Sequence, residues 1–487
     1  MKRAILLLAV IFSVVSVGFG QGTPKPLTLP ECVDIALKNN LRVRRGIYNV
    51  ETFNVNLFQA KMNFLPSLNA GTTQNFNFGR SINPVTNAFE AQQANSLNGQ
   101  LTSSWLLFNG FRLQNSFRQS KVDVEAADED LQKAKNDVII NVVTLYINVI
   151  FNKELLQNNE YQLSSSQQQL ERITKQVNAG ALPKSNQLTQ EAQVATNEVN
   201  LINQENALNL SLLQLKQAMQ VPASEQMDVI IPQIELEDLV LDATPDAVYA
   251  ESLKTMPEIK SAMLKVQSAQ LALKAAKGSL YPRLSLNAAA VSNYSSLNTD
   301  VPVYRTDGAP STTPGPNDVP IAYAYAPGLG SAPVYQFGRT LDHVDPNGHF
   351  DQLNKNLSQQ VGLNLQIPIF NQWSSRAQVQ RAAIQSELAR ISEIEIQNTL
   401  RQTIESAYND AYAASKTFAA NQKQVNAREE AYRMVLQRFE FGSANFVEKQ
   451  IAENDLFQSR SDLTRAKYNF IFRKKILDFY QGKQIDY

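Results

Sequence analysis

The residues best suited to metal chemistry lie together in one short segment, DHVDPNGHFD, at 342–351. It holds both histidines of the chain, His343 and His349, with the carboxylates of Asp342, Asp345 and Asp351. Imidazole and carboxylate groups at such spacing are ligands that transition metals accept. The same pattern is typical of a polar loop tip, which does not hold ligands in fixed positions. We therefore predict no metal site.

Catalytic constellations are missing from the rest of the sequence. Cys32 is the only cysteine, so the chain has no internal disulfide and no cysteine cluster. It lies too far beyond the apolar leader for a lipid anchor, and we expect a half-buried thiol on a helix. With no further histidine, neither a catalytic triad nor a zinc-hydrolase signature is possible, and no glycine-rich phosphate loop occurs. We predict a protein that is not an enzyme and needs no cofactor.

Composition narrows the class of protein further. The chain has 487 residues, more than one ordinary core requires. Lysine plus arginine and aspartate plus glutamate both number 45, so no basic surplus favours nucleic acid as a partner.

The first 20 residues are typical of a secretory signal peptide. Lys2 and Arg3 precede an apolar run that ends in small residues near Gly20. We expect no transmembrane helix after it, so any membrane must be crossed by strands.

The sequence contains an internal duplication. Phe108 corresponds to Phe370 and Gly180 to Gly442, at a constant offset of 262 residues. Upstream, FLPSLNA at 64–70 resembles LYPRLSLNA at 280–288 at an offset of 216. The second copy therefore carries 46 additional residues between these two points.

Four segments alternate with period two, which is the pattern of strands with different faces. In an exported protein, lipid and a water-filled lumen are one pair of surroundings that fits. The half-buried strands of a soluble sheet show the same pattern. The predicted strands are 66–78, 98–108, 283–292 and 357–369.

Long helical stretches keep apolar residues exactly one heptad apart, which indicates left-handed coiled coils. The first stretch carries Val142, Val149, Leu156, Leu163, Leu170 and Val177, and its repeat carries Ile404, Ala411, Phe418, Val425, Tyr432 and Phe439. A second seam follows each glycine turn, with Val194, Leu201, Leu208 and Leu215 in one copy and Leu456, Leu463, Phe470 and Leu477 in the other. Each copy thus predicts an antiparallel helical hairpin.

Helix lengths predict how these elements stack. A helix over 111–178 is about as long as 31–64 and 184–220 together, and 372–440 matches 246–278 plus 444–477. Two short helices are therefore expected end to end beside one long helix.

These observations give the following predicted organisation: signal peptide 1–20; first repeat 21–220 with hairpin 111–220; irregular proline-containing linker 221–245; second repeat 246–477 with hairpin 372–477; and C-terminal tail 478–487.

The segment LTLPECVDIALKNN at 27–40 resembles the opening helix motif of the TolC family of outer-membrane efflux proteins. The duplicated order of helix, two strands, long helix, glycine turn and helix matches that family over essentially the whole mature chain. The resemblance implies a mainly α fold with a β-barrel part: four strands per chain in a trimeric twelve-stranded transmembrane barrel, on a long periplasmic coiled-coil tube.

The same resemblance implies an outer-membrane exit duct of a Gram-negative tripartite efflux pump or type I secretion system. Its partners would be two further copies of the chain, outer-membrane lipid, a periplasmic adaptor protein and, through it, an inner-membrane transporter. Four strands cannot close a barrel alone, which supports a multimer independently. The alternative is a trimeric structural or adhesive coiled-coil stalk at the cell surface.

The family's docking and gating tips correspond to 177–186 and 439–448. The residues carried over are Val177, Gly180, Leu182, Ser185, Phe439, Gly442 and Ala444. No acid follows Gly180 within its tip, and Ala444 replaces a basic residue, so the closing contacts of the family are altered. Glu448 matches an acidic pore position, although a glutamate near a helix start is also favoured by the helix dipole.

The insertion, about 300–350, joins the two strands of the second copy and is expected outside the cell. It covers the barrel mouth, meets a surface partner, or is passive decoration.

Overall fold

The computed structural model describes residues 26–82, 89–91, 94–232, 244–296, 300–304, 322–326, 330–334 and 341–483. The predicted signal peptide lies outside these residues, as do parts of 221–245, 300–350 and 478–487. The chain divides into two units. The helical unit comprises Met1–Phe58, Phe117–Leu273 and Gln380–Tyr487, and the sheet unit comprises Gln59–Ser116 and Lys274–Val379.

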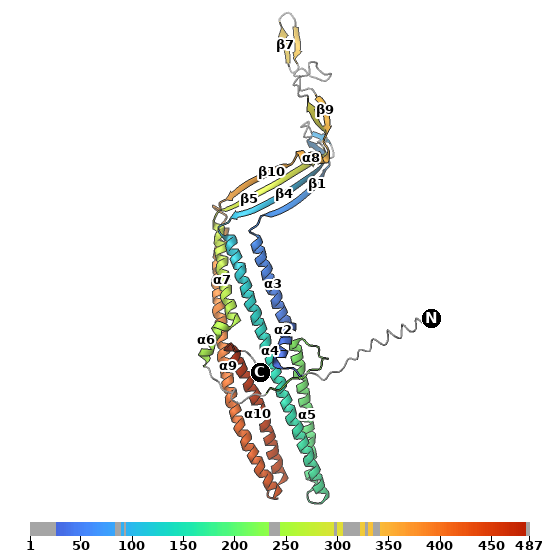
Figure 1. The fold of residues 1–487 in the computed structure, drawn as a ribbon, viewed down its shortest axis with the longest axis vertical. Coiled ribbons are helices and arrows are strands. Elements are labelled where there is room, and N and C mark those ends of the chain that lie inside the picture. The colour runs from blue at the N-terminus through green and yellow to red at the C-terminus, as the bar shows by residue number, and fades with distance from the viewer. Residues whose placement is uncertain are drawn as a thin grey trace, which may run out of the picture. The chain divides into compact units, whose positions relative to one another are not determined.

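Each repeat contributes one long helix and three shorter ones (Figure 1). In the first repeat these are α2 (Leu29–Asn39), α3 (Leu41–Met62), α4 (Arg112–Asn178) and α5 (Lys184–Met219). In the second they are α6 (Pro245–Thr255), α7 (Pro257–Lys277), α9 (Ser374–Glu440) and α10 (Phe446–Tyr480).

The single helices predicted over 31–64 and 246–278 are wrong, because each is broken in two. Met256 is extended, with ψ 126°, since the ring of Pro257 disfavours the helical conformation of the preceding residue. Asn40 is extended as well, with ψ 129°, and its side-chain oxygen accepts a hydrogen bond from the Arg42 N–H at 2.8 Å. The amide thus caps the start of α3.

The opening motif encodes its own helix start. The Thr28 side chain accepts from the Glu31 N–H, and the Glu31 carboxylate accepts from the Thr28 N–H at 2.8 Å. This reciprocal capping box, with a proline in the first turn, fixes the beginning of α2.

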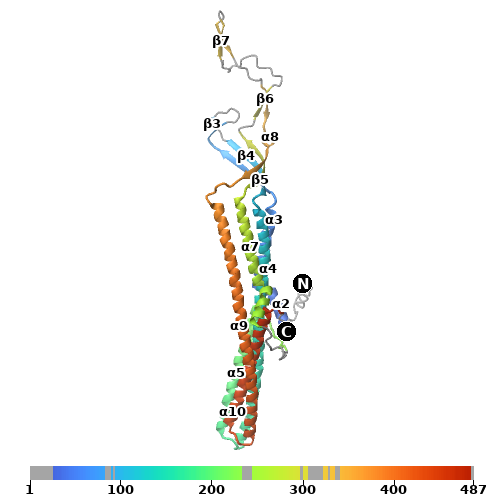
Figure 2. The ribbon, with the colours of Figure 1, turned by 90° about the vertical axis from the view of Figure 1, so that its left-hand side faces the viewer.

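The heptad residues pack as the sequence predicts. None of the twenty residues of the two pairs of seams is exposed. The Gln190 side chain donates to the Ser166 carbonyl at 2.9 Å, and Gln204 to Asn152, so α5 runs antiparallel to α4. Phe418 of α9 stacks on Phe470 of α10 with ring centroids 6.4 Å apart. Figures 1 and 2 show α9 and α10 side by side.

Two hydrophobic cores in the helical unit repeat the same arrangement. The larger contains Cys32 and Ala36 of α2, Val142 of α4, and Leu215 of α5. The smaller contains Val248, Ile404 of α9 and Leu477 of α10. Val142 with Leu215, and Ile404 with Leu477, are equivalent pairs at the offset of 262 residues. The duplication therefore extends to the packing.

The short helices of each repeat meet end to end, as the lengths predict. The Asn40 side chain donates to the Ala218 carbonyl near the end of α5 at 3.3 Å. In the second repeat the Ser252 hydroxyl of α6 donates to the Tyr480 carbonyl, the last residue of α10.

The described part of the linker is held against α4. The Tyr146 hydroxyl donates to the Ile230 carbonyl at 2.8 Å, and the Lys153 ammonium pairs with Asp228 at 2.7 Å. The linker is irregular but anchored.

One expectation about membrane segments needs correction. The helix α4 contains a window long and apolar enough to cross a membrane, although no transmembrane helix is expected there from the sequence. Half of that window is buried, because its valines and isoleucines form the larger core. A core helix passes the same test of length and composition.

Cys32 is fully buried rather than half-buried. Burial, with a smaller contribution from the charge of Glu31, raises the pKa of its thiol to about 12. The thiol therefore stays protonated and unreactive.

The four predicted strands form one antiparallel sheet. Its strands are β1 (Ser67–Asn77), β4 (Ala94–Phe108), β5 (Arg283–Ser295) and β10 (Ser358–Gln366), in the order β1-β4-β5-β10. The two copies therefore meet at β4 and β5, with β1 and β10 on the outside (Figure 1).

The turns that follow β4 and β10 repeat their backbone conformation. Gly110 and Phe111 have φ of 64° and 61°, and their equivalents Gln372 and Trp373 have φ of 56° and 64°. Two consecutive left-handed residues are uncommon outside glycine, so this shared conformation is strong evidence of duplication.

Short elements extend beyond the sheet. They are β2 (Arg80–Ile82) with β3 (Phe89–Ala91), β6 (Asp300–Tyr304) with β9 (Leu341–Pro346), β7 (Ala322–Ala326) with β8 (Gly330–Val334), the 3₁₀ turn η2 (Gly278–Leu280) and α8 (His349–Lys355).

His343 lies in β9, and His349 stacks on Tyr294 with ring centroids 3.9 Å apart. Among the residues that the structure describes, no group of three or more potential metal ligands occurs.

The duplicated cores allow a matched test of stability. Leu215→Ala and Leu477→Ala each leave a cavity at a fully buried, equivalent position, and we expect each to lower the free energy of unfolding by about 2–5 kcal/mol. Leu210→Ala in α5, whose side chain is exposed, is expected to change it by less than about 0.5 kcal/mol. Urea titration followed by far-ultraviolet circular dichroism measures all three. Equal midpoints for the three variants would contradict the assigned cores.

Candidate functional site

One face of the four-stranded sheet is mainly apolar. Directly opposed residues of neighbouring strands share a face, so the register assigns each side chain to one side. Leu68 opposes Ser103, Leu101 opposes Ala290, and Leu363 opposes Leu286. The apolar residues of this face are Leu68, Ala70, Phe76, Leu97, Leu101, Trp105, Leu284, Leu286, Ala288, Ala290, Tyr294, Val361, Leu363 and Leu365, and they outnumber its polar residues Thr72, Gln74, Asn95, Ser103, Ser292 and Gln359.

The opposite face is polar and almost free of charge. Asn69 opposes Thr102, Ser104 opposes Asn287, and Asn364 opposes Ser285. Arg283 is the only charged residue in the four strands. The polar face is built mainly of Asn69, Thr73, Asn75, Asn77, Ser96, Asn98, Gln100, Thr102, Ser104, Ser285, Asn287, Asn293, Gln360, Asn364 and Gln366.

The apolar face is uncovered in the single chain. Leu68 is 71% and Val361 75% exposed, and every residue of β1 and β10 is exposed. An apolar surface of this extent is not stable in water and marks a surface that contacts lipid or protein.

Both edges of the sheet are open. Within the described strands, β1 pairs only with β4, and β10 pairs only with β5. Each edge therefore presents backbone N–H and carbonyl groups without ladder partners. These edges require another strand wherever water is absent.

The helical hairpins end in two equivalent glycine turns. The Ala181 N–H donates to the Gln176 carbonyl at 2.8 Å, and the Gly180 N–H to the Val177 carbonyl at 3.0 Å. Ser443 and Gly442 make the corresponding hydrogen bonds to Arg438 and Phe439, at 2.8 and 3.0 Å. Both are Schellman motifs, with glycine φ of 74° and 75° in the left-handed region.

Side chains of the first tip are mostly accessible. Val177 and Leu182 are half-buried, and Ser185 is exposed in the first turn of α5. Pro183 precedes α5 without a side-chain cap. In the single chain this tip offers a small surface on which Lys184 is the one charged side chain.

The second tip is held by more polar contacts. Asn445 caps α10 by accepting from the Glu448 N–H at 2.8 Å, and the Glu448 carboxylate pairs with Arg438 at 3.4 Å. Phe439 is half-buried against Phe446, with ring centroids 6.4 Å apart, and Ala444 is half-buried. Glu448 thus stabilises the turn locally, in addition to any role in a pore.

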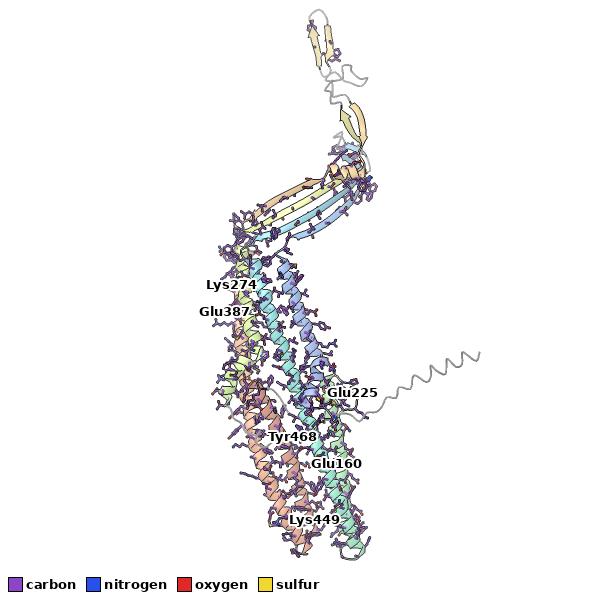
Figure 3. All side chains as sticks on the ribbon, in the orientation of Figure 1. Glu160, Glu225, Lys274, Glu387, Lys449 and Tyr468 are labelled. Carbon is purple, nitrogen blue, oxygen red and sulfur yellow. The ribbon has the colours of Figure 1, made fainter. Side chains whose placement is uncertain are left out.

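A buried ion pair near the tips was not predicted from the sequence. Lys449 of α10, labelled in Figure 3, lies 3.6 Å from Glu453 of the same helix, and their side chains are only 5% and 11% exposed. The Ser165 hydroxyl of α4 donates to Glu453 at 3.2 Å. Burial lowers the pKa of Lys449 and raises that of the nearby Tyr432 to about 12. The spacing of four residues suggests the pair, but only the packing of α4 against α10 reveals its burial.

Comparison with known proteins identifies the family. The family model described as outer membrane efflux protein matches residues 32–220 and 248–474. The outer membrane efflux protein BepC of Brucella suis biovar 1 (strain 1330) is 22% identical over 448 residues, which cover 91% of this chain and 83% of BepC. The proteases secretion protein PrtF of Dickeya chrysanthemi is 20% identical over 480 residues, covering 97% of this chain and 90% of PrtF.

A solved structure has the same fold. The crystal structure of the outer membrane protein VceC from Vibrio cholerae superposes with a TM-score of 0.69 at 12% identity, covering 94% of this chain and 97% of VceC. Together with the family match over most of the sequence, the duplicated fold leads to one conclusion: this chain belongs to the outer membrane efflux protein family, the TolC-type channels of the outer membrane, which are not enzymes.

Proposed function

We propose that three copies of this chain close a twelve-stranded barrel, which is the membrane-spanning part of an export duct. The two open edges of the sheet carry this proposal. Because neighbouring strands alternate in direction, β1 and β10 run oppositely, and β10 of one copy can pair antiparallel with β1 of the next. Repeating this contact closes the ring and removes every edge.

Three copies are the smallest number that leaves a duct. One chain cannot close its own four strands, and two would make an eight-stranded barrel whose interior is filled by side chains. Twelve strands enclose a water-filled lumen. The apolar face then contacts lipid, and the polar face, on which Arg283 is the one charged residue, lines the lumen.

The helical unit would form the periplasmic part of the duct. Its helices α4, α5, α9 and α10 are held by heptad seams, a geometry suited to a tube wall. The tips 177–186 and 439–448 would dock on a periplasmic adaptor, which links the channel to an inner-membrane transporter. The names of BepC and PrtF, for efflux and protease secretion, agree with a general exit duct.

Within the tips, each predicted site residue has a proposed task. Gly180 and Gly442 set the turns; Val177, Leu182 and Phe439 provide apolar contact; and Ser185 and Ala444 lie where an adaptor would approach. Glu448 would contribute negative potential at the narrow end, reduced by its pairing with Arg438.

The trimer is tested by mass. Protein extracted from the outer membrane in mild detergent is expected to have three times the mass of one mature chain by light scattering. A stable monomer from the same membrane would contradict the barrel.

The assignment of faces is tested by two neighbouring residues. Leu363→Arg places a charge on the lipid face, which costs about 2–4 kcal/mol at the membrane midplane, whereas Asn364→Arg places it in the lumen. We expect the first variant to be depleted from the outer-membrane fraction and the second to insert normally. Equal insertion of both variants would contradict the assignment of one face to lipid and the other to the lumen.

The tips are tested by replacing their glycines. Gly180→Val and Gly442→Val force a β-branched residue into left-handed backbone, at a cost of about 1–2 kcal/mol. We expect normal abundance and trimerisation, but lost export and weaker cross-linking of an adaptor from Ser185 or Ala444. Gly362→Val in β10 is the control, because its backbone is not left-handed and an added Cβ meets no atom. Unchanged export in both tip variants would argue against the docking role.

A further inference from the structure

We propose that Arg112 and Arg283 form a binding site for anionic solutes, and that three copies of it make the duct favour anions at the base of the barrel. This inference rests on the proposed trimeric barrel for its effect on transport. The site itself lies within one sheet unit.

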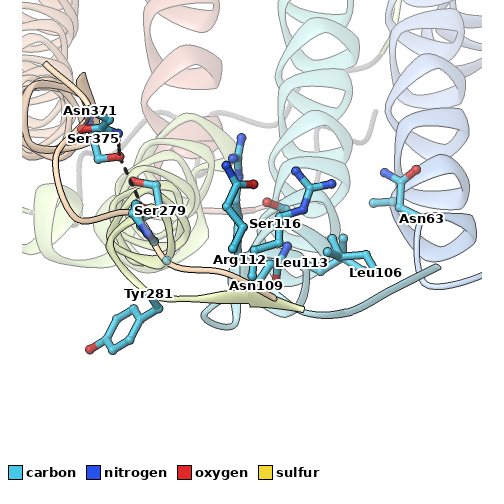
Figure 4. Close-up of a pocket in the computed structure, with 15 residues that line it drawn as sticks. Asn63, Leu106, Asn109, Arg112, Leu113, Ser116, Ser279, Tyr281, Asn371 and Ser375 are labelled. Atoms are coloured by element: carbon cyan, nitrogen blue, oxygen red, sulfur yellow. Dashed lines mark hydrogen bonds between the residues drawn. The ribbon is translucent and has the colours of Figure 1, made fainter. Parts of the chain in front are cut away.

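Both arginines line one cavity of about 490 Å³. Figure 4 shows this cavity, with Arg112 labelled. Its walls come from the end of α3, the start of α4, the η2 turn with the start of β5, and the segment between β10 and α9. The Ser375 hydroxyl donates to the Ser279 carbonyl at 3.3 Å, which ties two of these segments together. Segments far apart in sequence thus form one cavity that both arginines line.

The strand register assigns the cavity to the polar face. Arg283 opposes Gln366, and both share their side of the sheet with Ser285 and Asn364. Leu106, the residue of β4 that lines the cavity, opposes Ser285. In a closed barrel this face is the lumen.

The surroundings of this cavity contain cations but no carboxylate. The stretches 59–82, 94–116, 274–296 and 358–379 hold no aspartate or glutamate, and they hold Lys61, Arg80, Arg112, Lys274, Lys277, Arg283 and Arg376. Among the described residues, neither Arg112 nor Arg283 pairs with an acid.

The neighbouring groups suit an oxyanion. A guanidinium presents several N–H donors in a planar fork that matches carboxylate and phosphate oxygens. The amides of Asn63, Asn109 and Gln366 also line the cavity and can donate. The helix α4 begins at Arg112, so its amino-terminal dipole adds positive potential.

Three such sites would form a cationic ring. The remaining side chains on this face of the four strands carry no charge, so no opposing charge on the strands cancels it. A narrow duct with one sign of charge raises the local concentration of the opposite ions. We therefore assign carboxylate- and phosphate-bearing solutes as the class that this part of the duct favours.

Citrate binding to the detergent-solubilised full-length protein tests the site directly. Isothermal titration at low ionic strength is expected to show binding that weakens about tenfold or more in Arg112→Gln and Arg283→Gln. Arg376→Gln is the matched control, because Arg376 stacks on Trp373 at 4.7 Å and does not line this cavity. Equal binding by all four proteins, or none by the wild type, would overturn the site.

Reversal potentials in planar bilayers under a potassium chloride gradient test the effect on transport. We expect the wild type to favour chloride, Arg283→Gln to reduce that preference, and Arg283→Glu to reverse it. If the channel conducts but its ion selectivity is the same in the wild type, Arg283→Gln and Arg283→Glu, the inference is overturned and the proposed duct function stands. Citrate binding without any conductance or trimer would instead refute the duct and leave the site.

Discussion

The structure depends on one constraint: backbone hydrogen-bonding groups cannot be left unpaired in lipid. The sheet has an apolar face suited to hydrocarbon but two open edges, so the single chain is incomplete as a membrane protein. Its antiparallel order gives the edges opposite directions, which makes them complementary between copies. The polar face and the arginine cavity can act on transported solutes only when three copies close the barrel around a water-filled lumen.

In the helical unit, the duplicated sequence forms paired helices instead of an open sheet. Long helices stay paired through heptad seams, and Val142 with Leu215 is matched by Ile404 with Leu477 in a second core. The Schellman turns at Gly180 and Gly442 repeat as well. Equivalent local sequences thus produce equivalent packing, which favours a tube of similar hairpins over the surface stalk considered from sequence, as does the family match.

Most of the fold follows from the sequence because periodicity is local information. Alternation predicts the strands, heptads predict the hairpins, and a constant offset predicts their duplication. The interruption between α6 and α7 at Met256 could be predicted from Pro257. The interruption between α2 and α3 at Asn40 depends on the Asn40 side chain, which caps the next helix. The burial of Lys449 and the cavity that Arg112 and Arg283 both line were not predictable, because both depend on how segments distant in sequence pack together. The roles of the tip residues remain predictions.

The central claim is that β10 of one copy pairs with β1 of the next. Within one chain these strands are separated by β4 and β5, about 14 Å apart at the usual strand spacing, too far for a disulfide. One cysteine in each strand, scanned through the possible registers with buried Cys32 replaced by alanine, measures the contact directly. The account predicts disulfide-linked species that stop at three chains. Absence of cross-linking in every register, or ladders that continue beyond three, would contradict it.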